Sequence, residues 1–219
     1  LCDYLDTLPP TDKVSDLFAG QMEDYLRTFY ITGGMPEAVE TWIKTKDIEQ
    51  LEAVKQQILD SYELDFAKHA PSKDFPKLSA IWRSIPLQLS KDNSKFIFGQ
   101  VRKGWRAKDL EDALEWMISA GLVYKVAKIE KPFVPLSAYA DEAHFKLYLS
   151  DVGLLRKMAG VPAGAILNKL DEYREFKGAM TENFFLQEWM QRHDSVPFYW
   201  TSGNTAEVDF ILQHGVLTI

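Results

Sequence analysis

Within residues 106–131 the spacing of apolar residues changes from that of a helix to that of a strand, and this change restricts the fold class. Apolar residues first recur at helical spacing, at Leu110, Ala113, Leu114 and Met117. Gly121 ends that pattern, and from 123 to 129 apolar and polar residues alternate as in a strand with one buried face. A helix followed so closely by a strand predicts an α+β fold.

Helical spacing also dominates most of the remaining chain. Helices are expected over residues 15–30, 48–68, 77–89 and 180–193. Shorter alternating runs predict strands near residues 144–150, 197–204 and 206–212. The predicted fold class is therefore α+β and mostly helical.

The order of these elements divides the chain into an approach segment and three units. Residues 1–16, with two prolines, have the composition of a linker. The expected units are a helical unit (17–75), a winged-helix-like domain of three helices and a two-stranded wing (76–160), and an α/β unit (161–219). The last unit is expected to be incomplete at residue 219, and the chain is expected to be a segment of a longer protein.

Composition excludes several function classes. A net charge of −7 argues against a protein that coats nucleic acid or an anionic membrane through its overall field, although a local basic patch is compatible with that total. The single cysteine, Cys2, excludes an intramolecular disulfide and a cysteine-based zinc cluster, which favours a cytoplasmic location. No apolar run is long enough to span a membrane.

The candidate chemistry lies in the segment AEVDF, residues 206–210. Alternation along a strand predicts that Glu207 and Asp209 project from one face, while Val208 and Phe210 project from the other. On the expected helix over 180–193, Glu182 falls on the apolar side and would be directed toward these strand carboxylates.

Convergent carboxylates raise one another's pKa unless a cation or a lysine neutralises them, and Mg²⁺ prefers such oxygen ligands. Two alternatives remain open at the level of sequence. Glu182 could lie in the first turn of its helix, where the dipole favours an acid and water is near, and the strand carboxylates could simply face solvent. In the same helix, Asn183 and Gln187 are expected on solvated flanks.

A second candidate site is a basic trio before and within the predicted recognition helix of the winged-helix-like domain. Lys103, Arg106 and Lys108 would contact phosphates or bases there. The outward positions of the same helix are acidic, namely Asp109, Glu111, Asp112 and Glu115, and they oppose docking along a phosphate-lined groove. DNA contact and a purely architectural role therefore both remain open.

Several strings occurring in order resemble the C-terminal half of a group of prokaryotic AAA-type ATPases that carry a domain of unknown function, number 4143. The resemblance extends from about residue 20 to the end of the chain. The strings are YITGGMPEAV, IWRSIPLQLSKDNSKFIFGQVRKGWRAKDLEDALEWMISAGLVYKV, PLSAYAD, FKLYLSDVGLL, KGAMTENFFLQE and YWTSGNTAEVDF.

The resemblance implies a lid-like helical unit, a winged helix and a domain similar to the PD-(D/E)xK nucleases. Glu182 and Asp209 match catalytic metal ligands of that fold, and Glu207 is their neighbour on the same face. The Glu-x-Lys strand of those nucleases would begin after Ile219, and the ATP-binding core would precede residue 1. The divalent metal would be Mg²⁺, and ATP would bind only in the missing core.

These implications lead to two expectations for function. In the first, the chain is an inactive C-terminal fragment of an ATPase that binds ATP and handles or cleaves DNA with a divalent metal, and its partners are the missing ATPase core and DNA. In the second, it is a non-enzymatic regulatory or protein-interaction module with a relic nuclease fold. No membrane partner is expected.

Overall fold

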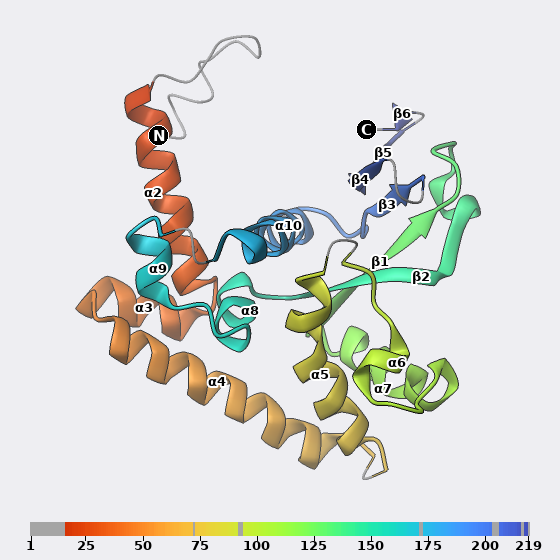
Figure 1. The fold of residues 1–219 in the computed structure, drawn as a ribbon, viewed down its shortest axis with the longest axis horizontal. Helices are drawn as coiled ribbons and strands as arrows, with labels where there is room; N and C mark the ends of the chain where they lie inside the picture. Colours follow the sequence, from red (N-terminus) through yellow and green to blue (C-terminus); the bar gives the residue numbers. More distant parts are fainter. Residues whose placement is uncertain are drawn as a thin grey trace.

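The fold was analysed in a computed structural model, which describes residues 16–71, 73–91, 94–170, 173–202, 206–215 and 217–218 (Figure 1). The expectation of a mostly helical α+β chain is confirmed. All but the last residue of the predicted linker lies outside the described residues. None of the helices in the described part of the chain is long and apolar enough to cross a membrane.

The first half of the chain is helical. Among the described residues its helices are α2 (Asp16–Thr32), α3 (Pro36–Thr45), α4 (Ile48–His69), α5 (Phe75–Leu89), α6 (Phe98–Val101) and α7 (Ala107–Ser119). The glycine stop after α2 is confirmed, because Gly33 has a φ of +67°, a conformation that favours glycine. Asp47 caps α4 by accepting hydrogen bonds from the backbone N–H groups of Glu49 and Gln50.

The strands follow α7 in the chain. They are β1 (Val123–Ile129), β2 (Ala140–Leu149), β3 (Phe198–Thr201), β4 (Glu207–Ile211), β5 (Gln213–His214) and β6 (Leu217–Thr218), with the 3₁₀ helix η1 (Leu136–Tyr139) between β1 and β2. The first four form one mixed sheet in the order β2-β1-β3-β4, and β5 pairs with β6. This sheet joins strands from the second and third predicted units, because β1 pairs with β3 in parallel at Lys128 and Tyr199.

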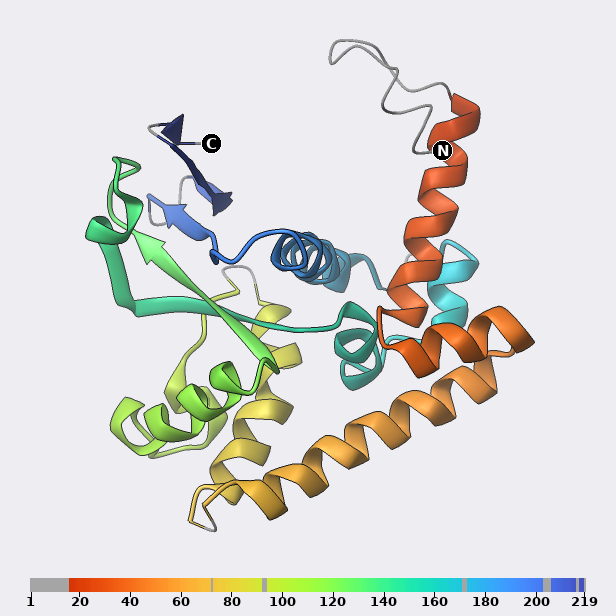
Figure 2. The ribbon, with the colours of Figure 1, turned by 180° about the vertical axis from the view of Figure 1, so that it is seen from behind.

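In the described part of the second half, the helices are α8 (Val152–Met158), α9 (Ala163–Leu167) and α10 (Arg174–Met190). In both ribbon views α10 lies between α2 and α9 on one side and the strands β3 and β4 on the other (Figures 1 and 2). The helix begins six residues before the predicted start at residue 180, which moves Glu182 to mid-helix. The alternative that placed Glu182 in a solvated first turn is therefore wrong.

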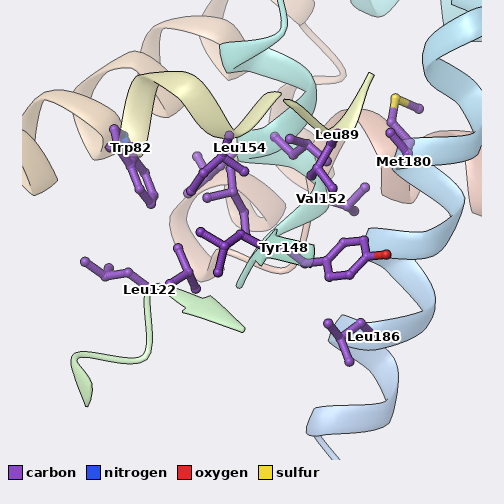
Figure 3. Packing of buried hydrophobic residues seen from close by; sticks show 14 of the residues in the cluster. Trp82, Leu89, Leu122, Tyr148, Val152, Leu154, Met180 and Leu186 are labelled. Carbon is purple, nitrogen blue, oxygen red and sulfur yellow. The ribbon is translucent and has the colours of Figure 1, made fainter. Parts of the chain in front are cut away.

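The hydrophobic core lies where α5, α8, α10 and the second half of β2 meet. Trp82, Leu89, Val152 and Leu154 are almost completely buried and pack around the end of β2. Figure 3 shows Tyr148 extending from β2 toward α10, close to Leu186. Helices α5 and α10 both contact β2, which explains why every residue from 145 to 149 is buried.

Candidate functional site

The predicted carboxylates meet around one buried lysine. The Nζ atom of Lys146 lies 2.7 Å from Oε1 of Glu207, 3.2 Å from Oδ1 of Asp209 and 3.3 Å from Oε2 of Glu182. Lys146 comes from β2, the two strand carboxylates from β4 and Glu182 from α10. We call these four residues the carboxylate cluster.

Two tyrosines enclose the cluster. The hydroxyl group of Tyr148 donates a 2.6 Å hydrogen bond to Oε2 of Glu182. The Lys146 ammonium lies 5.3 Å from the ring centroid of Tyr199 on β3, within the range of a cation–π contact. Burial raises the pKa of Tyr148 well above its usual value and that of Tyr199 to about 12, so both phenols are neutral at pH 7.

Opposing effects set the charge of the cluster. Burial lowers the pKa of Lys146, but the surrounding carboxylates outweigh it and raise the pKa above its usual value. Burial also raises the pKa of Glu182, against the opposite pull of Lys146 and of the Tyr148 hydrogen bond. The lysine is therefore a stable ammonium ion, and it faces up to three negative charges.

A β-bulge gives β4 an arrangement that strict alternation does not predict. Phe198 pairs with Ile211 and Trp200 with Val208, so Asp209 and Phe210 together oppose the single residue Tyr199. Phe210 stacks on Phe185 of α10 with a centroid distance of 4.6 Å. The expectation that Phe210 points away from the helix side is wrong, because the bulge interrupts the alternation.

Polar residues of α10 hold the helix against the segment that carries Lys146. The Asn183 side chain accepts a hydrogen bond from the Leu149 N–H at 2.9 Å and donates one to the Leu149 carbonyl at 3.0 Å. The Gln187 side chain accepts from the Val152 N–H at 2.8 Å. Both side chains are buried, so their expected position on solvated flanks is wrong: a helical wheel locates a face but does not reveal that a strand end and α8 cover it.

The basic trio lies elsewhere, around the start of α7. Lys103 lies in the connection from α6, Arg106 is the N-cap position of α7 and Lys108 lies in its first turn. The Arg106 N–H donates to Asp109, one of the acidic residues predicted to oppose a DNA groove. The structure keeps the three basic residues near one another and separate from the carboxylate cluster, and their binding role stays a prediction.

The carboxylate cluster does not fit a metal ion as it stands. Among the residues that the structure describes, no group of three or more histidine, cysteine, aspartate or glutamate side chains is placed to hold one. The carboxylate oxygens instead surround the ammonium of Lys146, which occupies the point on which they converge. Mg²⁺ therefore remains an expectation from the resemblance.

A second buried lysine, Lys55 of α4, was also missed by the sequence patterns. Its ammonium donates to the carbonyl oxygens of Ile31 and Gly153, the latter at 3.2 Å. Asp151 accepts hydrogen bonds from the N–H groups of Gly34, at 2.6 Å, and Leu154, at 2.7 Å. We call Lys55, Asp151 and the backbone groups they bind the helical junction, because they join α2, α4 and α8.

At the helical junction the pKa of the buried lysine is lowered, whereas in the carboxylate cluster it is raised. Burial, followed by the nearby charge of Arg156, lowers the pKa of Lys55 to about 7, while Asp151 and Glu52 act in the opposite direction. Arg156 itself is ion-paired with Glu52 and donates to the Val161 carbonyl at 2.6 Å.

Weak sequence signals for both lysines existed. Lys146 shares a strand face with Tyr148 between apolar neighbours, and Lys55 falls at four-residue spacing between Leu51 and Leu59, both buried. Neither signal shows that the face in question is enclosed. That depends on which helix packs on it.

Comparison with known proteins gives one family. A model described as a domain of unknown function (DUF8612) matches residues 23–164, well over half of the chain. The matched segment includes Lys55 and Lys146 but ends before Glu182, Glu207 and Asp209. Searches of curated proteins and of solved structures found no match.

Proposed function

The chain belongs to the DUF8612 family of domains of unknown function, and we propose that it is a non-enzymatic regulatory or interaction module in which Lys146 takes the place of a metal ion. In keeping with the sequence resemblance, its parent would be an AAA-type ATPase whose core binds ATP. The module would consist of a lid-like helical unit, a winged-helix-like domain and a relic of a nuclease-like unit.

One observation carries this proposal: the ammonium of a lysine that is 1% exposed lies within 3.3 Å of all three carboxylates. A divalent ion at that point would have to displace the lysine from its neutralising partners and leave a buried charge without compensation. The raised pKa of Lys146 makes its loss of charge near neutral pH unfavourable. The geometry thus favours a structural role for carboxylates that a nuclease would use for metal binding.

Metal titration tests the proposal. Thermal unfolding of the unaltered chain is expected to be unchanged by Mn²⁺ or Mg²⁺ at millimolar concentration, because the lysine already occupies the site. In Lys146→Met the carboxylates lose their cation, and Mn²⁺ is expected to raise the melting temperature. A metal-dependent rise in the melting temperature of the unaltered chain would reject the proposal, whether or not the variant folds.

A second candidate function is DNA cleavage by the longer protein with a divalent metal, with Glu182, Glu207 and Asp209 as ligands. The openness of the strand carboxylates favours it, because the side chains of Glu207 and Asp209 are 31% and 52% exposed. A full-length protein should then cleave DNA with Mg²⁺, and Asp209→Ala should abolish cleavage. Equal cleavage by the variant would exclude this site.

DNA binding through the basic trio is a separate expectation. Changing Lys103, Arg106 and Lys108 together to alanine should remove binding to duplex DNA at low salt if the trio contacts phosphates. The matched control changes three lysines on other elements, Lys44, Lys68 and Lys157. An unaltered chain that shows no binding at low salt would leave α7 with an architectural role alone.

A further inference from the structure

A cavity of about 450 Å³ lies between α2 and the beginning of α10, apart from the carboxylate cluster. Its wall carries four cationic side chains and one carboxylate, that of Glu23. The cations are Arg27, Lys169, Arg174 and Lys177. This is a locally positive hollow in a chain whose net charge is −7.

The cations differ in how far they are already neutralised. Arg27 pairs with Glu23 at 2.6 Å and with Asp24 at 2.7 Å, and Lys169 lies 3.9 Å from Asp24. Among the ion pairs of the described residues, none involves Lys177. Its position near the start of α10 adds the positive end of the helix dipole to its own charge.

The remaining wall combines hydroxyl groups with apolar surface. The Tyr30 hydroxyl and the Thr181 Oγ1 atom lie 3.1 Å apart and both line the cavity. Leu26, Leu170 and the ring of Tyr173 supply apolar contact area. The volume is that of a small-molecule site.

We propose that this cavity binds a small phosphorylated organic molecule. The cations would hold the phosphate through charge-assisted hydrogen bonds, and the apolar wall would cover the organic part. Both requirements are met within one hollow, whereas inorganic phosphate would leave the apolar wall uncovered. The inference does not depend on the role of Lys146.

Calorimetric titration with three probes tests this assignment. Phenyl phosphate is expected to bind more tightly than inorganic phosphate, and phenol, which lacks the phosphate, is expected not to bind at millimolar concentration. Binding of phenyl phosphate that is no tighter than that of inorganic phosphate would remove the organic part of the proposal. Absence of phenyl phosphate binding at millimolar concentration would reject the site.

Single variants locate the binding. Lys177→Ala is expected to weaken phenyl phosphate binding about tenfold, the loss typical of one charged hydrogen bond. The matched control is Lys44→Ala on α3, whose exposed side chain pairs with Glu40 away from the cavity. Equal affinities for Lys177→Ala and Lys44→Ala would overturn the assignment.

Discussion

Two regions of this molecule each bury a lysine, and their surroundings shift its pKa in opposite directions. In the carboxylate cluster, three acidic side chains surround Lys146 and raise its pKa above the usual value. In the helical junction, Lys55 meets carbonyl oxygens and lies near Arg156, and its pKa falls to about 7. Both side chains are almost inaccessible to solvent.

Burial alone therefore does not decide the charge of a lysine. Burial opposes the ammonium form in both regions, and the partners determine whether that cost is offset. Three carboxylates around the ammonium offset it at Lys146, whereas the carbonyl oxygens and the charges of Asp151 and Glu52 do not at Lys55. The cluster is thus held by contacts between charged side chains, and the junction is held by hydrogen bonds between charged side chains and the backbone.

The largest effect is expected from removing the ammonium of the cluster. Lys146→Met should lower the free energy of unfolding at pH 7 by about 3 kcal/mol, because a buried ion-pair network loses its only cation. Urea unfolding measures this. Lys125→Met on β1, which removes a pair with Glu142 near the surface, is the matched control and should cost below about 1 kcal/mol. Equal losses would show that the cluster contributes no more than a surface pair.

The next largest effect tests how tightly the junction is packed. A Cβ atom on Gly33 would lie 2.2 Å from Oδ1 of Asp151, and the φ of +67° disfavours any other residue. Gly33→Ala should therefore lower the free energy of unfolding by about 2 kcal/mol. Gly160→Ala is the control, because its φ is +70° but no atom lies within 4 Å of the added Cβ. If both variants lose the same stability, the contact with Asp151 does not constrain the junction.

The pH dependence of stability distinguishes the two lysines directly. Unfolded Lys55 keeps its proton up to a pH near 10.5, whereas folded Lys55 releases it near pH 7. The unfolded state binds more protons between these values, so the Lys55 contribution to stability rises with pH. From pH 7 to 8.5 the unaltered chain should gain about 1.5 kcal/mol relative to Lys55→Met. A parallel course of the two urea-unfolding series would contradict a lowered pKa.

The smallest effect concerns the neutral member of the cluster. Tyr148→Phe removes the 2.6 Å hydrogen bond to Glu182 but leaves the ring packing intact. The expected loss in urea unfolding is about 1 kcal/mol, against no comparable loss for Tyr124→Phe on β1. A loss as large as that of Lys146→Met would assign the stability of the cluster to the phenol instead of the ammonium.

Sequence reasoning succeeded where local pattern decides structure. The period change before β1, the glycine stop after α2 and the end of α5 at Leu89 all follow from short-range preferences. The meeting of Glu182 with Glu207 and Asp209 was also predicted, from one helix face and one strand alternation. The neutralising lysine was left unnamed, because its strand is distant in sequence and pairs elsewhere in the sheet.

The features that the sequence did not predict share one physical cause. The bulge at Asp209 and Phe210, the burial of Asn183 and Gln187, and the burial of Lys55 all depend on tertiary neighbours. Residues 145–149 alternate as in a strand with one covered face, although all five are buried. The packing of both α5 and α10 on β2 covers residues that the sequence pattern alone leaves exposed.

The two hydrogen bonds between the Asn183 side chain and the Leu149 backbone have a consequence for how such sequences can diverge. The amide binds both backbone polar groups of one residue, its N–H and its C=O, and no side-chain atom. Position 149 can therefore drift among apolar residues without loss of the contact, whereas position 183 requires a side chain that both donates and accepts at that length. Asn183, the tenth residue of α10, is therefore expected to be a better marker for aligning distant relatives than Leu149, to which it binds.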